Sequence, residues 1–306
     1  METSKNPLIK YEDFLVAFID LLGFESQVID SCQNPDTLSK IDYALEAFSQ
    51  LRLKSTWEKN RILMEIEEDA QKRNLNDYYI DKMVRCFCFS DSIIIMVKAD
   101  KHIEERSSAL VAMLSKIGAD LLSKGILIRG AISFGQMHVD ENSQSTKAFG
   151  PAIIDAYKLE QKQATYPRIV LSNQLINKLE YPLNEKYKRH PYHQYINRFE
   201  DGLVGFSQLT FFEVIQSCEE VLPRKDFFEM IQKSKKVIIA GLDENMCNAH
   251  VFEKYNWLKD EFNKLSIILR DESGERIKFH IYDAQIPDSR HNIHYSYINE
   301  FYDRNQ

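Results

Sequence analysis

The chain has 306 residues, of which 44% are hydrophobic and 28% are charged. This balance is typical of a folded globular protein, and the length suffices for one large domain or two ordinary ones. The formal net charge of −7 argues against a protein that coats nucleic acid. The apolar runs fall short of the roughly 18 residues of a membrane-spanning helix. The N-terminal stretch METSKNPLIKYEDF has no signal-peptide core, so we expect a cytoplasmic protein without a membrane or nucleic-acid partner.

The first elements of the chain surround one unusual charge. Residues 14–22 predict a central β-strand, because FLVAFIDLL is apolar on both faces apart from Asp20. A helix is predicted over 35–55, where a Pro-Asp-Thr start signal precedes apolar residues at helical spacing. The charged stretch 56–80 predicts a solvated insertion with helical tendency.

A hairpin and a long helix follow. Strands over 83–89 and 92–98 are predicted to form a hairpin whose turn carries Asp91. An amphipathic helix over 102–124 is predicted to end at Gly125, which is a typical helix stop.

The next elements complete a recognisable order. A strand is predicted over 126–139, and DENSQSTKA after it predicts a loop or hairpin turn. A helix over 149–163 opens with Gly-Pro, and a strand over 168–172 precedes another short helix. The order predicts an α+β fold with a ferredoxin-like (βαββαβ), palm-type core, in which an antiparallel sheet carries helices on one face.

Residues 181–306 are expected to form a C-terminal extension packed on a domain of residues 1–180, because no flexible linker separates the two. Within the extension, GLVGFSQLTFFEVI predicts a strand, and helices are predicted over 224–238 and 243–265. The segment SIILRDESGERIKFHIYDA predicts a final hairpin that turns at Glu-Ser-Gly.

The two aspartates are expected to meet at one edge of the sheet, because each comes at the end of a neighbouring strand. An unpaired carboxylate inside a strand is costly, and paired carboxylates suit Mg²⁺ or Mn²⁺. Two such ions about 3.5–4 Å apart can clamp a triphosphate. The simpler alternative is that Asp20 caps a helix and Asp91 fills a turn. After Asp20, the backbone N–H groups of Leu22, Gly23 and Phe24 are expected at a helix N-terminus, where they would bind phosphate oxygens.

The segments FIDLLGF and FSDS, followed by IRGAISFG and FGPAIIDAYKLE, resemble the class III nucleotidyl cyclase domain over about residues 11–180. More narrowly, they resemble the pyrimidine cyclases of bacterial antiphage Pycsar systems. The resemblance implies that Asp20, Asp91 and the backbone carbonyl of Leu21 bind two Mn²⁺ or Mg²⁺ ions per site. It also implies a head-to-tail homodimer with sites at the interface. There the 3′-hydroxyl of a nucleoside triphosphate attacks its own α-phosphorus, which gives a 3′,5′-cyclic nucleotide and pyrophosphate.

One departure from the family pattern lies on the helix that carries FGPAIIDAYKLE. Purine-specific members have an Asn there and, four positions later, an Arg, and these positions are Ile154 and Lys158 here. We expect the positive charge of Lys158 to interact with a phosphate during catalysis, without the bidentate hydrogen bonds that an arginine would form. The alternatives are that Lys158 is a solvated helix lysine, or that Asp155 or Tyr157 has the polar role.

A second departure concerns recognition of the base. Adenylate cyclases usually place a purine-reading lysine four residues before the second aspartate, where this chain has Phe87. Its ring would shrink the pocket. Arg85 shares that strand face, and we hypothesise that it binds a carbonyl oxygen of a pyrimidine; the alternative is an arginine that only flanks a hydrophobic strand. Arg129 is expected to contact a phosphate or the dimer partner.

The leading interpretation is a homodimeric cyclase that makes cyclic UMP or cyclic CMP, with UTP favoured over CTP, as a messenger to a separate effector in antiphage defence. An adenylate or guanylate cyclase with an unusual base pocket is the alternative enzyme. A non-catalytic nucleotide-binding palm domain is the alternative outside enzymes. Asp20 favours an enzyme, because a scaffold has no reason to keep a charge inside a central strand.

Overall fold

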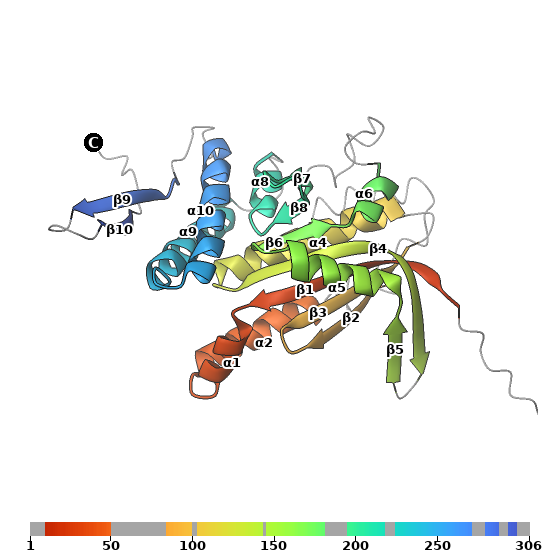
Figure 1. The fold of residues 1–306 in the computed structure, drawn as a ribbon. Helices are drawn as coiled ribbons and strands as arrows, with labels where there is room; N and C mark the ends of the chain where they lie inside the picture. The colour runs from red at the N-terminus through yellow and green to blue at the C-terminus, as the bar shows by residue number, and fades with distance from the viewer. Residues whose placement is uncertain are drawn as a thin grey trace, which may run out of the picture.

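A computed structural model describes residues 10–49, 84–99, 103–142, 145–180, 195–217, 224–270, 279–287 and 293–298. The insertion predicted over 56–80 lies outside these residues. The fold is α+β, with a mostly antiparallel sheet between layers of helices (Figure 1).

The predicted βαββαβ core is present. Its strands are β1 (Glu12–Leu22), β2 (Val84–Phe89), β3 (Ser92–Lys98) and β4 (Leu127–Asn142). They lie in the order β2-β3-β1-β4, and each neighbouring pair is antiparallel. Its helices are α2 (Pro35–Ser49), which follows the short α1 (Phe24–Ser31), and α4 (Ile103–Ser123). The helix α4 ends at Ser123, and Gly125, two residues later, has a left-handed φ of 81°.

Successive side chains of the central strand β1 point to opposite faces of the sheet, and side chains on both faces are buried. Odd-numbered residues from Leu15 to Leu21 join the main core with α2 and α4. Even-numbered residues from Phe14 to Phe18 join a smaller cluster with Ala152 of α5 (Pro151–Gln163). The helix α5 therefore covers the face opposite to α2 and α4, and Asp20 lies on the α5 side by the same alternation.

Beyond the core, the sheet continues into the C-terminal half of the chain. The segment DENSQSTKA turns a hairpin between β4 and β5 (Ser145–Phe149). Next to β4 lies the parallel strand β6 (Arg168–Leu171), which precedes the short helix α6 (Asn173–Lys178). The strands β8 (Val204–Ser207) and β7 (Asn197–Arg198) then extend the same sheet.

The segment GLVGFSQLTFFEVI is a strand only at its start, so the prediction of one long strand is wrong. After β8 the chain forms α8 (Thr210–Ser217). The buried side chain of Gln208 follows the strand; its oxygen accepts from Ile128 N, and its nitrogen donates to the carbonyls of Gly118 and Ile126. The Ser207 hydroxyl accepts from Leu209 N at 3.1 Å, which supports the turn into the helix.

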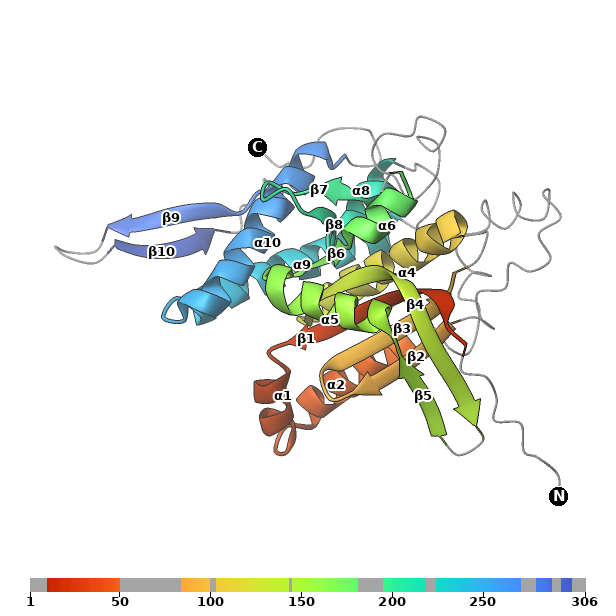
Figure 2. The ribbon, with the colours of Figure 1, turned by 45° about the vertical axis from the view of Figure 1, so that its right-hand side comes forward.

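Two long helices, α9 (Arg224–Glu244) and α10 (Ala249–Ile268), confirm the helices predicted in the C-terminal half. The first residues of the hairpin predicted over SIILRDESGERIKFHIYDA are helical, because α10 continues through Ile268, and its predicted turn at Glu-Ser-Gly lies outside the described residues. The observed hairpin is formed by β9 (Tyr282–Pro287) and β10 (Ile293–Ile298), and it lies beside α9 and α10, away from the main sheet (Figure 2). In the described part of the chain, every helix is too short or too polar to cross a bilayer.

Candidate functional site

Asp20 lies within β1 rather than at its end. Its neighbours across the sheet are Ser92 of β3 and Arg129 of β4. Pairing with β3 stops at Asp20, whereas pairing with β4 continues to Leu22. The Asp20 side chain retains 14% of its exposure, so it sits at the border between the sheet and solvent.

Asp91 occupies the turn between β2 and β3, directly beside this position. Ser90 takes the left-handed conformation, with φ of 56°, which makes the turn tight. The backbone N–H of Leu21 donates to the Asp91 carbonyl oxygen at 3.0 Å. The turn is therefore tied to the residue after Asp20, and the two acids share one edge of the sheet.

Arg129 joins Asp20 to a third acid. Its Nε donates to Asp20 Oδ2 at 2.8 Å and also lies 2.8 Å from Glu160 Oε1. The alignment of the second contact is poor, so Glu160 Oε1 has no hydrogen bond although the side chain is fully buried. The guanidinium group of Arg129 thus lies beside the carboxylates of both Asp20 and Glu160.

The sequence analysis gave Glu160 no role, although a signal was present. Ala152, Ala156 and Glu160 are the buried residues of α5, and they recur every four residues. This spacing forms one stripe on a helix, so a charge in the stripe points toward the sheet. The Glu160 side chain, as part of this stripe, therefore contacts Arg129.

The electrostatics of the site show an excess of negative charge. Burial raises the pKa of Asp20, and Asp91 raises it further, while Arg129 and the more distant Lys254 lower it. Burial also raises the pKa of Glu160, against the effect of Arg129 and together with the charges of Asp20 and Asp91. Both acids would therefore be stabilised by an additional cation.

The donor set is compatible with a cation that arrives with a phosphate ligand. Among the described residues, no group of three or more His, Cys, Asp or Glu side chains is arranged to hold a metal. Mg²⁺ commonly binds to one or two carboxylates and completes its shell with substrate phosphates and water. Asp20, Asp91 and the Leu21 carbonyl suit that role, and the Arg129 guanidinium already places a positive charge on Asp20.

The segment after β1 forms a tight entry into α1. Gly23 has φ of 73° and precedes Phe24, the first residue of α1. A side chain would be strained at this backbone conformation, so glycine suits the position. Leu22 is the last residue of β1, so only Gly23 and Phe24 stand at the start of the helix.

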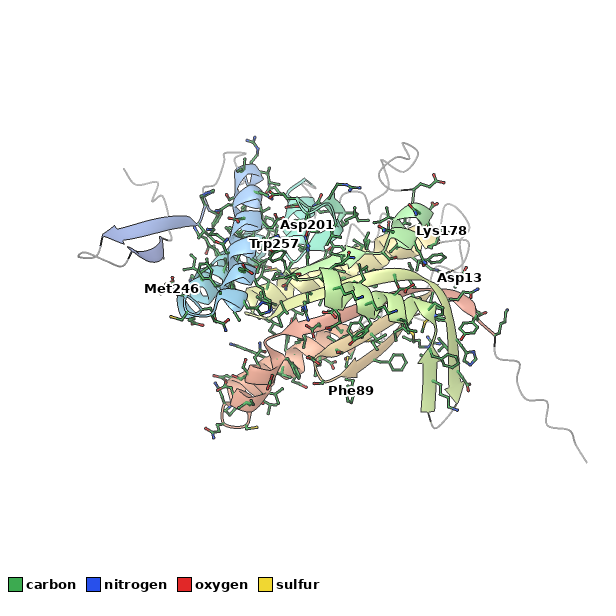
Figure 3. All side chains as sticks on the ribbon, in the orientation of Figure 1. Asp13, Phe89, Lys178, Asp201, Met246 and Trp257 are labelled. Atoms are coloured by element: carbon green, nitrogen blue, oxygen red, sulfur yellow. The ribbon has the colours of Figure 1, made fainter. Side chains whose placement is uncertain are left out.

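The base-recognition candidates share the α5 face of the sheet with Asp20 but are farther away. Phe87 packs against the smaller cluster, and Arg85 hydrogen-bonds through Nη1 to the Val84 carbonyl at 3.3 Å. Asp20 pairs with Ser92 of β3, and Ser92 pairs with Phe89 of β2. Phe89 is therefore the β2 residue in the same row as Asp20, and the Phe89 side chain is 83% exposed (Figure 3). Arg85 therefore lies four positions along β2 from the row of Asp20.

The α5 candidates lie outside the stripe that carries Glu160. Lys158, Ile154 and Tyr157 are exposed, and Asp155 is half-buried. The Tyr157 ring meets the Phe18 ring edge-on at 5.4 Å. Lys158 therefore leaves the helix on the side opposite to the Glu160 stripe.

No family model matches the sequence, and no curated protein matches it either. Solved structures that resemble the chain include the adenylyl cyclase CyaB from P. aeruginosa, with 14% identity, a TM-score of 0.39, and coverage of 56% of this chain and 82% of that chain. A class III adenylyl cyclase-like ATP-binding protein from Pseudomonas aeruginosa has 13% identity and a TM-score of 0.40, and the match covers 77% and 44% of the chains. The guanylate cyclase domain of RhGC from Catenaria anguillulae, in complex with GTP, has 13% identity, a TM-score of 0.33 and coverage of 56% and 85%. At these values the likenesses establish neither family nor activity.

Proposed function

We propose that the chain is a nucleotidyl cyclase of the class III type that converts a pyrimidine nucleoside triphosphate, UTP in preference to CTP, to the 3′,5′-cyclic nucleotide and pyrophosphate. The observation that carries the proposal is the edge of the βαββαβ sheet. There Asp20 lies inside the central strand, and the Leu21 N–H binds the Asp91 turn at 3.0 Å. The left-handed Gly23 and the start of α1 follow directly.

Each of these groups has a role in the proposed reaction. Asp20, Asp91 and the Leu21 carbonyl would hold Mn²⁺ or Mg²⁺, which when bound would neutralise phosphate charge and activate the 3′-hydroxyl. Gly23 and Phe24 direct backbone N–H groups to phosphate oxygens. Glu160, 2.8 Å from Arg129 Nε, would keep Arg129 in place beside the phosphates if Asp20 binds a cation. Catalysis then comes from positioning and charge neutralisation.

The proposed assembly is a cytoplasmic homodimer with its sites at the interface. The outer side of α5 supports it, because Ile154 and Tyr157 expose 50% and 49% of their surface beside the exposed Lys158. Exposed apolar side chains of this kind favour contact with another protein surface. In the dimer, Lys158 would bring charge to a phosphate of the facing site. We assign catalysis to residues 1–180 and propose that the cyclic product acts on a separate effector in antiphage defence.

The preference for a pyrimidine rests on Arg85 and Phe87. Replacement of Arg85 by Ala should lower kcat/KM for UTP about tenfold, because a charge-assisted hydrogen bond to the base is lost. The free energy of unfolding should change little, since Arg85 is half-buried on the outer strand β2. Arg198→Ala, on the distant strand β7, is the matched control. Full activity of Arg85→Ala would remove Arg85 from the site.

The function is tested by incubation of the purified chain with ATP, GTP, CTP or UTP and Mn²⁺, followed by mass spectrometry of the products. We expect cyclic UMP as the main product and cyclic CMP as the next. A cyclic purine would contradict the pyrimidine preference and would favour an adenylate or guanylate cyclase. Nucleotide binding without any cyclic product would contradict the enzyme and would favour a non-catalytic palm domain.

A further inference from the structure

We propose that Lys254 of α10 binds the phosphate groups of the nucleotide at the Asp20–Asp91 site, so that the C-terminal half of the chain completes this site. The inference rests on the proposed function for the identity of the ligand. It gives the extension a direct role in binding, and it supplies a cation that the sequence analysis did not identify.

The first support is the way α10 is held against the sheet. Its Trp257 ring stacks on Tyr166 at 5.4 Å with an angle of 6° between the planes. The same indole lies 5.7 Å from the guanidinium carbon of Arg168, the first residue of β6. Because β6 pairs in parallel with β4 at Gly130 and Ile169, these contacts hold α10 at the end of the sheet where β6 begins beside β4.

The second support is the position of Lys254 on this helix. Lys254 precedes Trp257 by three residues, so both side chains lie on one face of α10. Lys254 is one turn nearer to the start of the helix. Both views show the first turns of α10 on the side of the molecule where β1 ends (Figures 1 and 2). The face of α10 that carries Trp257 thus carries Lys254 toward the Asp20 edge.

The third support is electrostatic. Burial lowers the pKa of Lys254, the positive charge of Arg129 lowers it further, and the negative charge of Asp20 opposes both. Lys254 in turn lowers the pKa of Asp20. The charge of Lys254 therefore acts on both partners of the Asp20–Arg129 pair.

Lys254 is also available for a ligand. It forms no hydrogen bond or ion pair with the residues that the structure describes, whereas Arg129 is engaged by two acids. A lysine on a flexible stem acts as a point charge that can follow a phosphate group. The structural alternative is that Lys254 only offsets the negative charge of Asp20, in which case its removal would not weaken phosphate binding.

The test measures binding of inorganic tripolyphosphate with Mg²⁺ by calorimetry, so the result does not depend on the base. Lys254→Met should weaken binding about tenfold, because a charge-assisted hydrogen bond is lost. Lys254→Arg should restore most of the affinity, and orthophosphate should show a smaller loss. Lys236→Met, an exposed lysine of α9, should bind as the unmodified chain does. Thermal unfolding of each variant checks the fold.

Equal affinity of Lys254→Met and the unmodified chain would overturn the inference, as would an unmodified chain that does not bind tripolyphosphate. The triphosphate assay separates this failure from that of the proposed function. If the unmodified chain forms a cyclic nucleotide while Lys254→Met keeps the same KM, only the inference fails. If Lys254→Met loses tripolyphosphate but the unmodified chain forms no cyclic product, only the proposed function fails.

Discussion

Two arginines on neighbouring parallel strands, Arg129 of β4 and Arg168 of β6, meet carboxylates in opposite ways. Arg168 is 2% exposed and places both terminal nitrogens on the carboxylate of Asp201, with Nη1 at 3.1 Å from Oδ1. Aromatic rings lie beside its guanidinium, with Phe199 at 4.7 Å and Trp257 at 5.7 Å. Arg129 instead directs a single nitrogen between two acids.

The difference separates an ion pair with balanced charges from a cluster with an excess of negative charge. Although burial alone would raise the pKa of Asp201, hydrogen bonding to Arg168 lowers it, as expected for a satisfied ion pair. The pKa of Asp20 is raised by burial in spite of Arg129. The Arg168 pair therefore joins the C-terminal half to the sheet, whereas the Arg129 cluster would gain from a further cation.

The largest effect expected from this comparison is on activity. Asp20→Asn should reduce cyclic nucleotide formation at least about 10³-fold, because the carboxylate that positions charge at the phosphates is removed. The free energy of unfolding should change by less than about 1 kcal/mol, since the unfavourable burial of a charge is relieved at the same time. Product assays and urea unfolding measure the two quantities. Asp42→Asn, exposed on α2, is the control, and an active Asp20→Asn enzyme would contradict the site.

The opposite pattern, a loss of stability with activity retained, is expected at Arg168. Asp201→Ala leaves the buried Arg168 without its carboxylate and should lower the free energy of unfolding by about 3 kcal/mol. Activity per folded molecule should be retained, because Asp201 lies outside the proposed site. Urea unfolding and product assays check both, with the exposed Asp226→Ala as control. A stability loss below about 1 kcal/mol would show that the pair is not the structural contact.

A smaller effect is expected when Arg129 loses one of its two acids. Glu160→Gln leaves Arg129 with Asp20 alone, so a cation must compete harder for that carboxylate. The Mn²⁺ concentration that gives half-maximal activity should rise about tenfold, as is typical when a group behind a metal ligand is changed. A titration of activity with Mn²⁺ measures it, and an unchanged midpoint would show that Glu160 does not hold Arg129 away from Asp20.

The smallest effect concerns Glu213 of α8, a half-buried acid that pairs with no arginine among the described residues. Burial raises the pKa of Glu213, and the charge of Glu261 raises it further. A raised pKa means that the ionised form destabilises the fold above that pKa. Glu213→Gln should therefore increase stability slightly at about pH 7, and the difference should disappear below pH 4.5, where the carboxyl is protonated in both states. Urea unfolding across this range checks the sign, and a variant less stable at neutral pH would contradict it.

The βαββαβ core could be predicted because its elements have strong local signals. The apolar run of β1, the two-residue turn at Asp91 and the apolar stripe of α4 each specify one element type. Asp20 was recognisable as a functional candidate from the same logic, since a charge within such a strand needs a partner.

The rest depended on contacts between distant segments. The strand-like segment after β8 forms α8, and Gln208 between the two elements binds the distant Gly118 and Ile128, which no local pattern reveals. The position of Lys254 depends on how α10 packs against Tyr166 through Trp257, and these contacts join segments far apart in the sequence. Tertiary packing of this kind cannot be read from periodicity.

The most direct test of the central claim is crystallography of the chain with Mn²⁺ and 3′-deoxyuridine triphosphate, which lacks the attacking hydroxyl. The account predicts anomalous peaks of Mn²⁺ about 2–2.5 Å from the carboxylates of both Asp20 and Asp91, with the triphosphate bound to them. Peaks elsewhere, or an Asp20 that stays bound to Arg129 while the nucleotide occupies another part of the molecule, would contradict it.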